Sequence, residues 1–451
     1  MAALPDPRHR RLPALVAGAL VVLLLAVATG VAVARAGRSA RSSAPRAAAP
    51  PTMAGPAVPG TTATTTTVLP EPGYITEIKQ QVAGLRGLAW KRPLAVAVVS
   101  KDELARRYRA GTERDAKPDR LAGDGDTFHL LHLVPRDVDY AKTVEDLYSG
   151  LVLGFYDPET KELVVGDSGG QVDAGTKVTL AHELDHALTD QWFDFGAATK
   201  ALDDADREEE VDAYDALIEG DAKRLESVYA DTYLSEEEQL AYALGGLGGG
   251  DDALAAKLAK TPKFLLDYLY FPYTSGLDFV KAEAATRGNA GVDDAYRRPP
   301  TSTEQILHPD LYAAAQGWTP PSLPDLATAT TCQVTRRNAL GEFKMEELLG
   351  SELGSSAATA AAAGWNGDAF ETVRCGSALG MVERWQADSE AAATRLAAAL
   401  ARWGPAWSKG RASGGRFSGS AGTGRVVQSG ARVDLVLADD AATADRLAGL
   451  S

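Results

Sequence analysis

Cysteine is scarce in this sequence, with only Cys332 and Cys375 among 451 residues. The two are too far apart for the CxxC spacing of cysteine-bound metal sites, so the sequence excludes a site of that class. In an oxidising compartment an even pair can form a disulfide. The sequence therefore favours a structural bridge between Cys332 and Cys375 over two buried free thiols.

Positive charge is also in short supply. The chain has 46 Lys and Arg against 61 Asp and Glu, which gives a formal net charge of -15. Seven arginines and a single acid fall within residues 1–46, so the rest of the chain is more acidic still. Proteins that bind nucleic acid neutralise phosphates with Lys and Arg. This charge balance argues against nucleic acid as a partner.

One long stretch lacks charge altogether. Residues 12–34 are uncharged and follow a basic tail at 1–11; as a helix they span the roughly 30 Å of a hydrocarbon core. Residues 35–72 are rich in Pro, Ala and Thr and predict an extended linker. The sequence thus predicts a transmembrane helix or signal anchor, a membrane partner through that helix, and a single-pass cell-membrane protein with an extracytoplasmic body. A signal peptide cleaved near AVARA is the alternative.

Histidine is rare, with six residues, and two stand four apart in VTLAHELDHALTDQWF, residues 178–193. The apolar spacing of this stretch predicts a helix. His182 and His186 would then project from one face and bind one Zn²⁺ ion at about 2.0–2.1 Å. Glu183 would lie beside the ion as the base for an activated water. Chance produces such a pattern in roughly one chain of this composition in two hundred, so we favour a metal site over an incidental pair of histidines.

A catalytic zinc needs a third protein ligand and an open position. We predict Glu219, in ALIEGDA, because it lies at the edge of an apolar helix face, 33 residues after His186. Other acids of the same helix are rivals, and most of them are expected on a solvated face: Glu208, Glu209, Glu210, Asp212 and Asp215. Calcium is a weaker alternative, because EF-hand spacing is lacking.

These motifs resemble a known family. HELDHALTD resembles the active-site helix of the thermolysin-type zinc peptidases, and EGDA is similar to the segment that holds the third zinc ligand in aminopeptidases of the same gluzincin group. Within residues 140–312, a longer pattern resembles uncharacterised bacterial membrane-anchored proteins of metallopeptidase type: LGFYDPETKELVV, LAHELDHALTDQ, ALIEGDA, FPYTSGLDFV and RPPTSTEQILHP. The resemblance implies a gluzincin fold with His182, His186 and Glu219 on zinc and Glu183 as base. The acid Asp185 between the histidines departs from that pattern, and we expect it to contact the domain that follows.

Other residues are candidates for supporting roles. An oxyanion needs a hydrogen-bond donor, and Tyr273 and His308 are candidates, although each can equally be structural. Zinc-bound histidines usually donate their second N–H to a carboxylate, which Asp190 or Asp215 could provide. His129 and His132 fall in FHLLHL, which reads as a β-like run with ordinary histidines on opposite sides.

The predicted fold class is α+β: a zincin-like metallopeptidase domain with a small sheet and an active-site helix, an N-terminal transmembrane helix, and a small C-terminal α/β module. The predicted divisions are 1–11 (tail), 12–34 (span), 35–72 (linker), 73–330 (zinc metallopeptidase domain) and 331–451 (C-terminal module). The predicted function is an extracytoplasmic zinc-dependent peptidase acting on a peptide or protein substrate. Two alternatives remain open: a cell-surface binding or structural protein on a zincin scaffold, with structural zinc or lost activity, and a small-molecule amidase.

Overall fold

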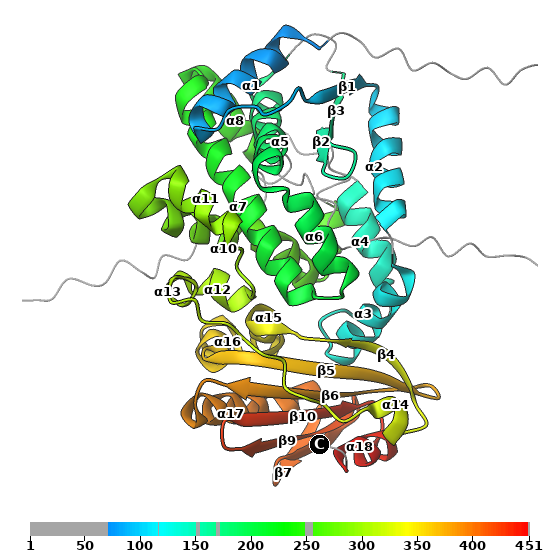
Figure 1. Ribbon diagram of the computed structural model, residues 1–451. Coiled ribbons are helices and arrows are strands. Elements are labelled where there is room, and N and C mark those ends of the chain that lie inside the picture. The colour runs from blue at the N-terminus through cyan, green and yellow to red at the C-terminus, as the bar shows by residue number, and fades with distance from the viewer. Residues whose placement is uncertain (1–70, 116, 150–153, 168–171, 249–255, 450–451) are drawn as a thin grey trace, which may run out of the picture.

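The computed structural model describes residues 71–449 except 116, 150–153, 168–171 and 249–255. The described chain forms two parts that lie end to end (Figure 1). The first is mainly helical and contains a three-stranded sheet, and the second is built on a seven-stranded sheet. The C-terminal part is therefore the strand-rich one.

The central strand of the three-stranded sheet is β3 (Glu162–Gly166). It pairs in parallel with β1 (Ala95–Val99) and antiparallel with β2 (Gly154–Asp157). Four helices precede or separate these strands: α1 (Gly73–Arg86), α2 (Lys101–Asp115), α3 (Pro118–Leu130) and α4 (Tyr140–Ser149). Since β2 is an edge strand, its free side is left to face α5 (Ala174–Phe193). The backbone N–H of Tyr156 on that strand donates to a side chain of α5.

Helix α5 begins at a side-chain cap, because Asp173 accepts a hydrogen bond from the backbone N–H of Thr176. It ends at Asp194, whose backbone is left-handed with φ 51°. Every residue from 178 to 191 is buried, so α5 is a core helix enclosed on all sides. Its neighbours are α1, α7 (Glu208–Tyr233) and the small sheet. Polar groups on such a helix must find partners inside the protein.

Glycine permits a close crossing between α7 and α10 (Lys263–Arg287). A Cβ on Gly220 would lie 2.3 Å from the carbonyl oxygen of Gly276, and a Cβ on Gly276 would lie 2.1 Å from that of Ala216. The two backbones are therefore in contact beside Glu219. Further helices complete this part: α6 (Phe195–Asp204), α8 (Glu236–Gly248), α11 (Asn289–Arg297), α12 (Thr303–Leu307) and α13 (Pro309–Ala313).

The second part is an antiparallel sheet in the order β4-β5-β6-β10-β9-β8-β7. Its strands are β4 (Gln333–Asn338), β5 (Trp365–Cys375), β6 (Ala378–Ala387), β7 (Gly410–Ser413), β8 (Arg416–Gly419), β9 (Thr423–Ser429) and β10 (Arg432–Ala438). One apolar face packs on α15 (Gly341–Leu353), α16 (Ser355–Ala362) and α17 (Glu390–Trp407). The other face packs on α14 (Leu326–Ala329) and α18 (Ala441–Ala448). A disulfide joins Cys332 to Cys375, which confirms the predicted bridge.

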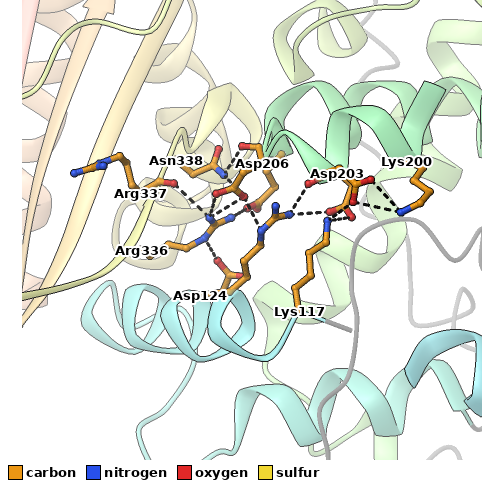
Figure 2. A network of polar contacts seen from close by, with 11 residues as sticks. Lys117, Asp124, Lys200, Asp203, Asp206, Arg336, Arg337 and Asn338 are labelled. Carbon is orange, nitrogen blue, oxygen red and sulfur yellow. Dashed lines mark hydrogen bonds and ion pairs between the residues drawn. The ribbon is translucent and has the colours of Figure 1, made fainter. Parts of the chain in front are cut away.

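Buried charges connect the two parts. Arg336 of β4 binds Asp206 at 2.8 Å and also reaches Asp124 of α3 (Figure 2). Lys344 of α15 lies 2.5 Å from Asp212 of α7 and 3.2 Å from the Glu208 carboxylate. The acidic N-terminal end of α7 is thus held by two cations of the C-terminal part. Our prediction that the acids at the start of α7 lie mostly on a solvated face was wrong, because Glu209, Glu210 and Asp212 are buried. The cations that pair with Glu208 and Asp212 come from residues more than a hundred positions later in the chain.

Two predictions are corrected: the N-terminal transmembrane helix in the fold class and the single-pass location in the cell membrane. The segment 12–34 lies outside the described residues, and no helix among the residues that are described is long and apolar enough to cross a membrane. The longest, α7, carries acidic side chains along much of its length. The fold class supported here is mixed α/β, and the transmembrane helix and single-pass membrane location are withdrawn.

One local prediction also fails. FHLLHL was expected to be β-like, but His129 lies on α3 and His132 follows it with a left-handed backbone, φ 60°. The apolar residues of this stretch continue the helical period of Leu121 and Phe128, which are both buried in the core. A short apolar run does not by itself show whether a segment is a strand or a helix. Here the first residues of the run continue the helix that the preceding residues of α3 have already formed.

Candidate metal centre

Three ligand atoms from α5 and α7 converge on one point. Nε2 of His182 lies 3.1 Å from Nε2 of His186 and 3.2 Å from Oε2 of Glu219. Nε2 of His186 lies 3.6 Å from the same carboxylate oxygen. The structure thus brings together the three residues that the sequence singled out as ligands, and it brings in none of the rival acids of α7.

These separations fit a zinc ion. Two atoms that bind one ion at about 2.0–2.1 Å with tetrahedral angles are about 3.3–3.4 Å apart, and the three measured distances fall on either side of that value. Two imidazole nitrogens and one carboxylate oxygen are a ligand set that zinc accepts. Among the described residues the cluster has three members and no fourth His, Cys, Asp or Glu. The donor set therefore fits a zinc ion with one coordination position left open.

Glu183 lies next to this cluster and is almost fully buried. Its Oε2 accepts a hydrogen bond of 2.6 Å from the backbone N–H of Tyr156 on β2. Its Oε1 has no hydrogen-bond partner among the described residues. One carboxylate oxygen is fixed by the sheet edge and the other is available to accept a proton, which is the arrangement that a general base requires.

The sequence reasoning missed one supporting residue, Glu226. Its Oε2 lies 3.5 Å from Nδ1 of His182, and its other oxygen is bound by Lys223 and by the hydroxyl of Tyr242. The expected partner Asp190 instead binds the Tyr156 hydroxyl, Lys161 and a backbone N–H. The spacing of Glu226, seven residues after Glu219 and so on the same helix face, is the signal that could have found it.

The charges around the triad favour a cation. Burial alone would lower the pKa of His182, but the carboxylates of Glu219 and Glu226 outweigh it and raise that pKa to about 10. Burial would raise the pKa of Glu219, but His186 and His182 hold it at about 2. Burial raises the pKa of Glu183 to about 8. A site that retains a proton between two carboxylates can also accept a divalent cation, because both relieve the same negative charge.

Tyr273 and His308, the two candidate oxyanion donors, are placed differently. The ring of Tyr273 on α10 stacks on His182, with centroids 6.4 Å apart. Tyr273 lies about one turn before Gly276 on α10, so the close contact of Gly276 with α7 places the Tyr273 ring near His182. His308, between α12 and α13, has its Nε2 3.1 Å from Oε1 of Glu342 on α15. Glu342 raises the pKa of His308, and the described contacts of this histidine are with the junction rather than with the triad.

Comparisons with known proteins cover only the second part of the chain. A family model described as a domain of unknown function, DUF8575, matches residues 330–448, about a quarter of the sequence. No curated protein and no solved structure matches the chain. The C-terminal part is therefore similar to a family without an assigned function, and the metal-centre helices have no matched relative.

Proposed function

We propose that this chain is a zinc-dependent peptidase, with His182, His186 and Glu219 as the zinc ligands and Glu183 as the general base. The observation that carries the proposal is the convergence of two imidazole nitrogens and one carboxylate oxygen at spacings that suit zinc, next to a glutamate with one oxygen available. The choice of peptide bonds rests on the similarity of HELDHALTD and EGDA to gluzincin motifs.

In this mechanism the protein positions groups and moves a proton. Zinc, when bound, supplies a Lewis acid that polarises the scissile carbonyl and lowers the pKa of an attacking water. Glu183 takes a proton from that water through Oε1 and passes it to the leaving amine nitrogen. Tyr273, stacked beside His182, donates to the negative charge that develops on the carbonyl oxygen. Glu226 holds the N–H of His182 so that Nε2 presents its lone pair.

A zinc with only a structural role is the alternative. Structural sites are closed by four protein ligands, whereas catalytic sites keep three and an open position. The cluster has three members among the residues that the structure describes. This count favours catalysis over a scaffold whose zinc is structural.

The test compares the wild type with Glu183→Gln by metal analysis and by mass spectrometry of a broad peptide-library digest. The wild type should contain zinc and cleave peptides, and Glu183→Gln should keep the zinc while losing about 10²-fold or more in rate, because it cannot take the proton. Glu237→Gln, the same change on the exposed face of α8, should behave as the wild type. Zinc without cleavage in the wild type would point to the structural alternative, and full activity of Glu183→Gln would overturn the assignment of the base.

A further inference from the structure

One buried arginine, Arg86, contacts both helices that carry the proposed metal ligands, α5 and α7. Arg86 is the last residue of α1 and is 1% exposed. Its guanidinium faces three carboxylates from three helices: Asp221 of α7 at 2.9 Å, Asp293 of α11 at 2.7 Å and Asp185 of α5 at 3.7 Å. Asp185, expected to contact the domain that follows, thus faces the first helix of the described chain instead.

The arginine is held firmly in this position. Gly87, with φ 70°, ends α1 in a left-handed turn that suits glycine. The side-chain amide of Asn289 donates to the carbonyl oxygens of Leu85 and Arg86, each at 2.8 Å. Arg224 links Asn289 to the carboxylate of Asp221. The end of α1 is therefore fixed to α7 and α11 by both backbone and side chain.

The two inner carboxylates lie within two residues of metal ligands. Asp185 directly precedes His186 on α5, and Asp221 follows Glu219 by two residues on α7. Both side chains are fully buried. Two residues are about 200° of helix rotation, so Asp221 projects from the side of α7 away from Glu219. Arg86 thus contacts α5 and α7 within two residues of the proposed metal ligands on each helix.

We propose that Arg86 is a positioning residue of the metal centre, whose guanidinium sets the separation of α5 and α7 through its hydrogen bond to Asp221 and its ion pair with Asp185. The inference rests on the proposed zinc site. Without the guanidinium, two buried carboxylates would face each other across the helix pair. The attraction that draws α5 and α7 toward one cation is then lost, and Glu219 shifts with α7 relative to the histidines. Lysine replaces the charge but not the planar fork that reaches two carboxylates at once.

If Arg86 only stabilised the fold, its loss would have different consequences from those expected for a positioning residue. Lys344 is equally buried and also binds two acids of α7, Asp212 and Glu208, which precede Glu219 by about two and three helical turns. If buried pairing affected only stability, Arg86 and Lys344 would be equivalent. If Arg86 positions the ligands, only its loss changes the affinity and geometry of the metal centre while the protein remains folded.

The experiment measures the zinc dissociation constant by competition with a chromophoric chelator, at a temperature at which circular dichroism shows each variant folded. Arg86→Met should bind zinc about tenfold or more weakly, Arg86→Lys should lie between it and the wild type, and Lys344→Met should bind as the wild type does. Cobalt(II) in place of zinc should give a visible absorption band that changes in Arg86→Met and not in Lys344→Met. If Arg86→Met does not fold, Arg86→Lys provides the comparison.

Equal affinities of wild type and both Arg86 variants would overturn the inference and leave the proposed function intact. Equal weakening by Lys344→Met would overturn it as well, since the effect would then be one of stability. A wild type that binds no zinc would instead overturn the proposed function, and the role of Arg86 with it.

Discussion

Oε2 of Glu226 lies 3.5 Å from Nδ1 of His182, on the opposite side of the ring from the Nε2 atom that faces Glu219. With zinc bound, this carboxylate would keep the remaining ring proton of His182 on Nδ1, so that the lone pair of Nε2 points to the ion. Lys223 and the hydroxyl of Tyr242 hold the other oxygen of Glu226. The proposed ligand His182 is therefore fixed by a chain of contacts that reaches α8.

Removing this carboxylate should weaken zinc binding without removing a ligand. Glu226→Ala should raise the zinc dissociation constant by about 10–100-fold, measured by chelator competition, and Glu226→Gln should lie closer to the wild type because its amide oxygen still accepts a hydrogen bond. Glu238→Ala, which removes a partly exposed acid paired with Lys177, is the control and should leave the constant unchanged. Wild-type affinity in Glu226→Ala would show that His182 needs no such support.

The glycine crossing between α7 and α10 should tolerate no side chain. Gly220→Ala or Gly276→Ala places a Cβ within 2.3 Å of a backbone oxygen, and the backbones must separate. We expect a loss of about 3 kcal/mol or more in the free energy of unfolding, measured in urea, together with loss of zinc. Gly84→Ala is the matched control: its Cβ meets nothing within 4 Å on the exposed face of α1, so it should stabilise the protein by about 0.5–1 kcal/mol. If Gly220→Ala unfolded with the same free energy as the wild type, the backbones of α7 and α10 could not be in the close contact described.

The C-terminal part should stabilise the ligand helix through Lys344. Lys344→Met leaves Asp212 and Glu208 without this buried cation and should cost about 3–5 kcal/mol in the free energy of unfolding. Lys281→Met, at an exposed pair with Asp278, should change the free energy of unfolding by less than about 0.5 kcal/mol. Urea titration followed by fluorescence measures both. Similar small effects in the two variants would mean that the buried pairs of Lys344 with Asp212 and Glu208 contribute little to the free energy of unfolding.

Glu383 makes stability depend on pH. This residue of β6 is buried, and neither carboxylate oxygen has a hydrogen-bond partner among the described residues. Burial, with Asp368 adding to it, raises its pKa well above the ordinary value. The folded state therefore holds a proton that the unfolded state releases above about pH 4.3. As pH rises from there toward the folded pKa, the free energy of unfolding falls by about 1.4 kcal/mol per pH unit from this group.

Glu383→Met and Glu383→Gln should both remove this contribution, so their unfolding free energies should fall less between pH 5 and 8 than that of the wild type. Glu383→Met should also exceed the wild type in stability at pH 8, because it leaves no buried polar group without a partner. Glu352→Gln, on an exposed face of α15, should keep the wild-type slope. An unchanged slope in both Glu383 variants would assign the pH dependence to other buried acids.

The ligand set could be proposed from sequence because it depends on short-range regularities. His182 and His186 are one helical turn apart, and an apolar stripe beside Glu219 marks the inward face of α7. Helix periodicity in VTLAHELDHALTDQWF also located α5 to within a few residues. These features are set by neighbours in the chain.

Long-range charge pairing could not be predicted in the same way. Glu208 and Asp212 at the start of α7 were expected on a solvated face, yet they pair with Arg336 and Lys344, which lie more than a hundred residues later in the chain. Asp185 looked anomalous between two histidines until Arg86, about a hundred residues earlier, was seen to face it. Pairs of this kind depend on how helices assemble, and a sequence pattern carries no record of that assembly.

The most direct test of the zinc centre is the metal content of the purified chain in the wild type, in Glu219→Ala and in Glu210→Ala. Glu210 lies on the same helix but binds Arg207 instead of the cluster. We expect one zinc per chain in the wild type and in Glu210→Ala, and much less than one in Glu219→Ala. Full zinc occupancy in Glu219→Ala, or no zinc in the wild type, would contradict the proposed metal centre.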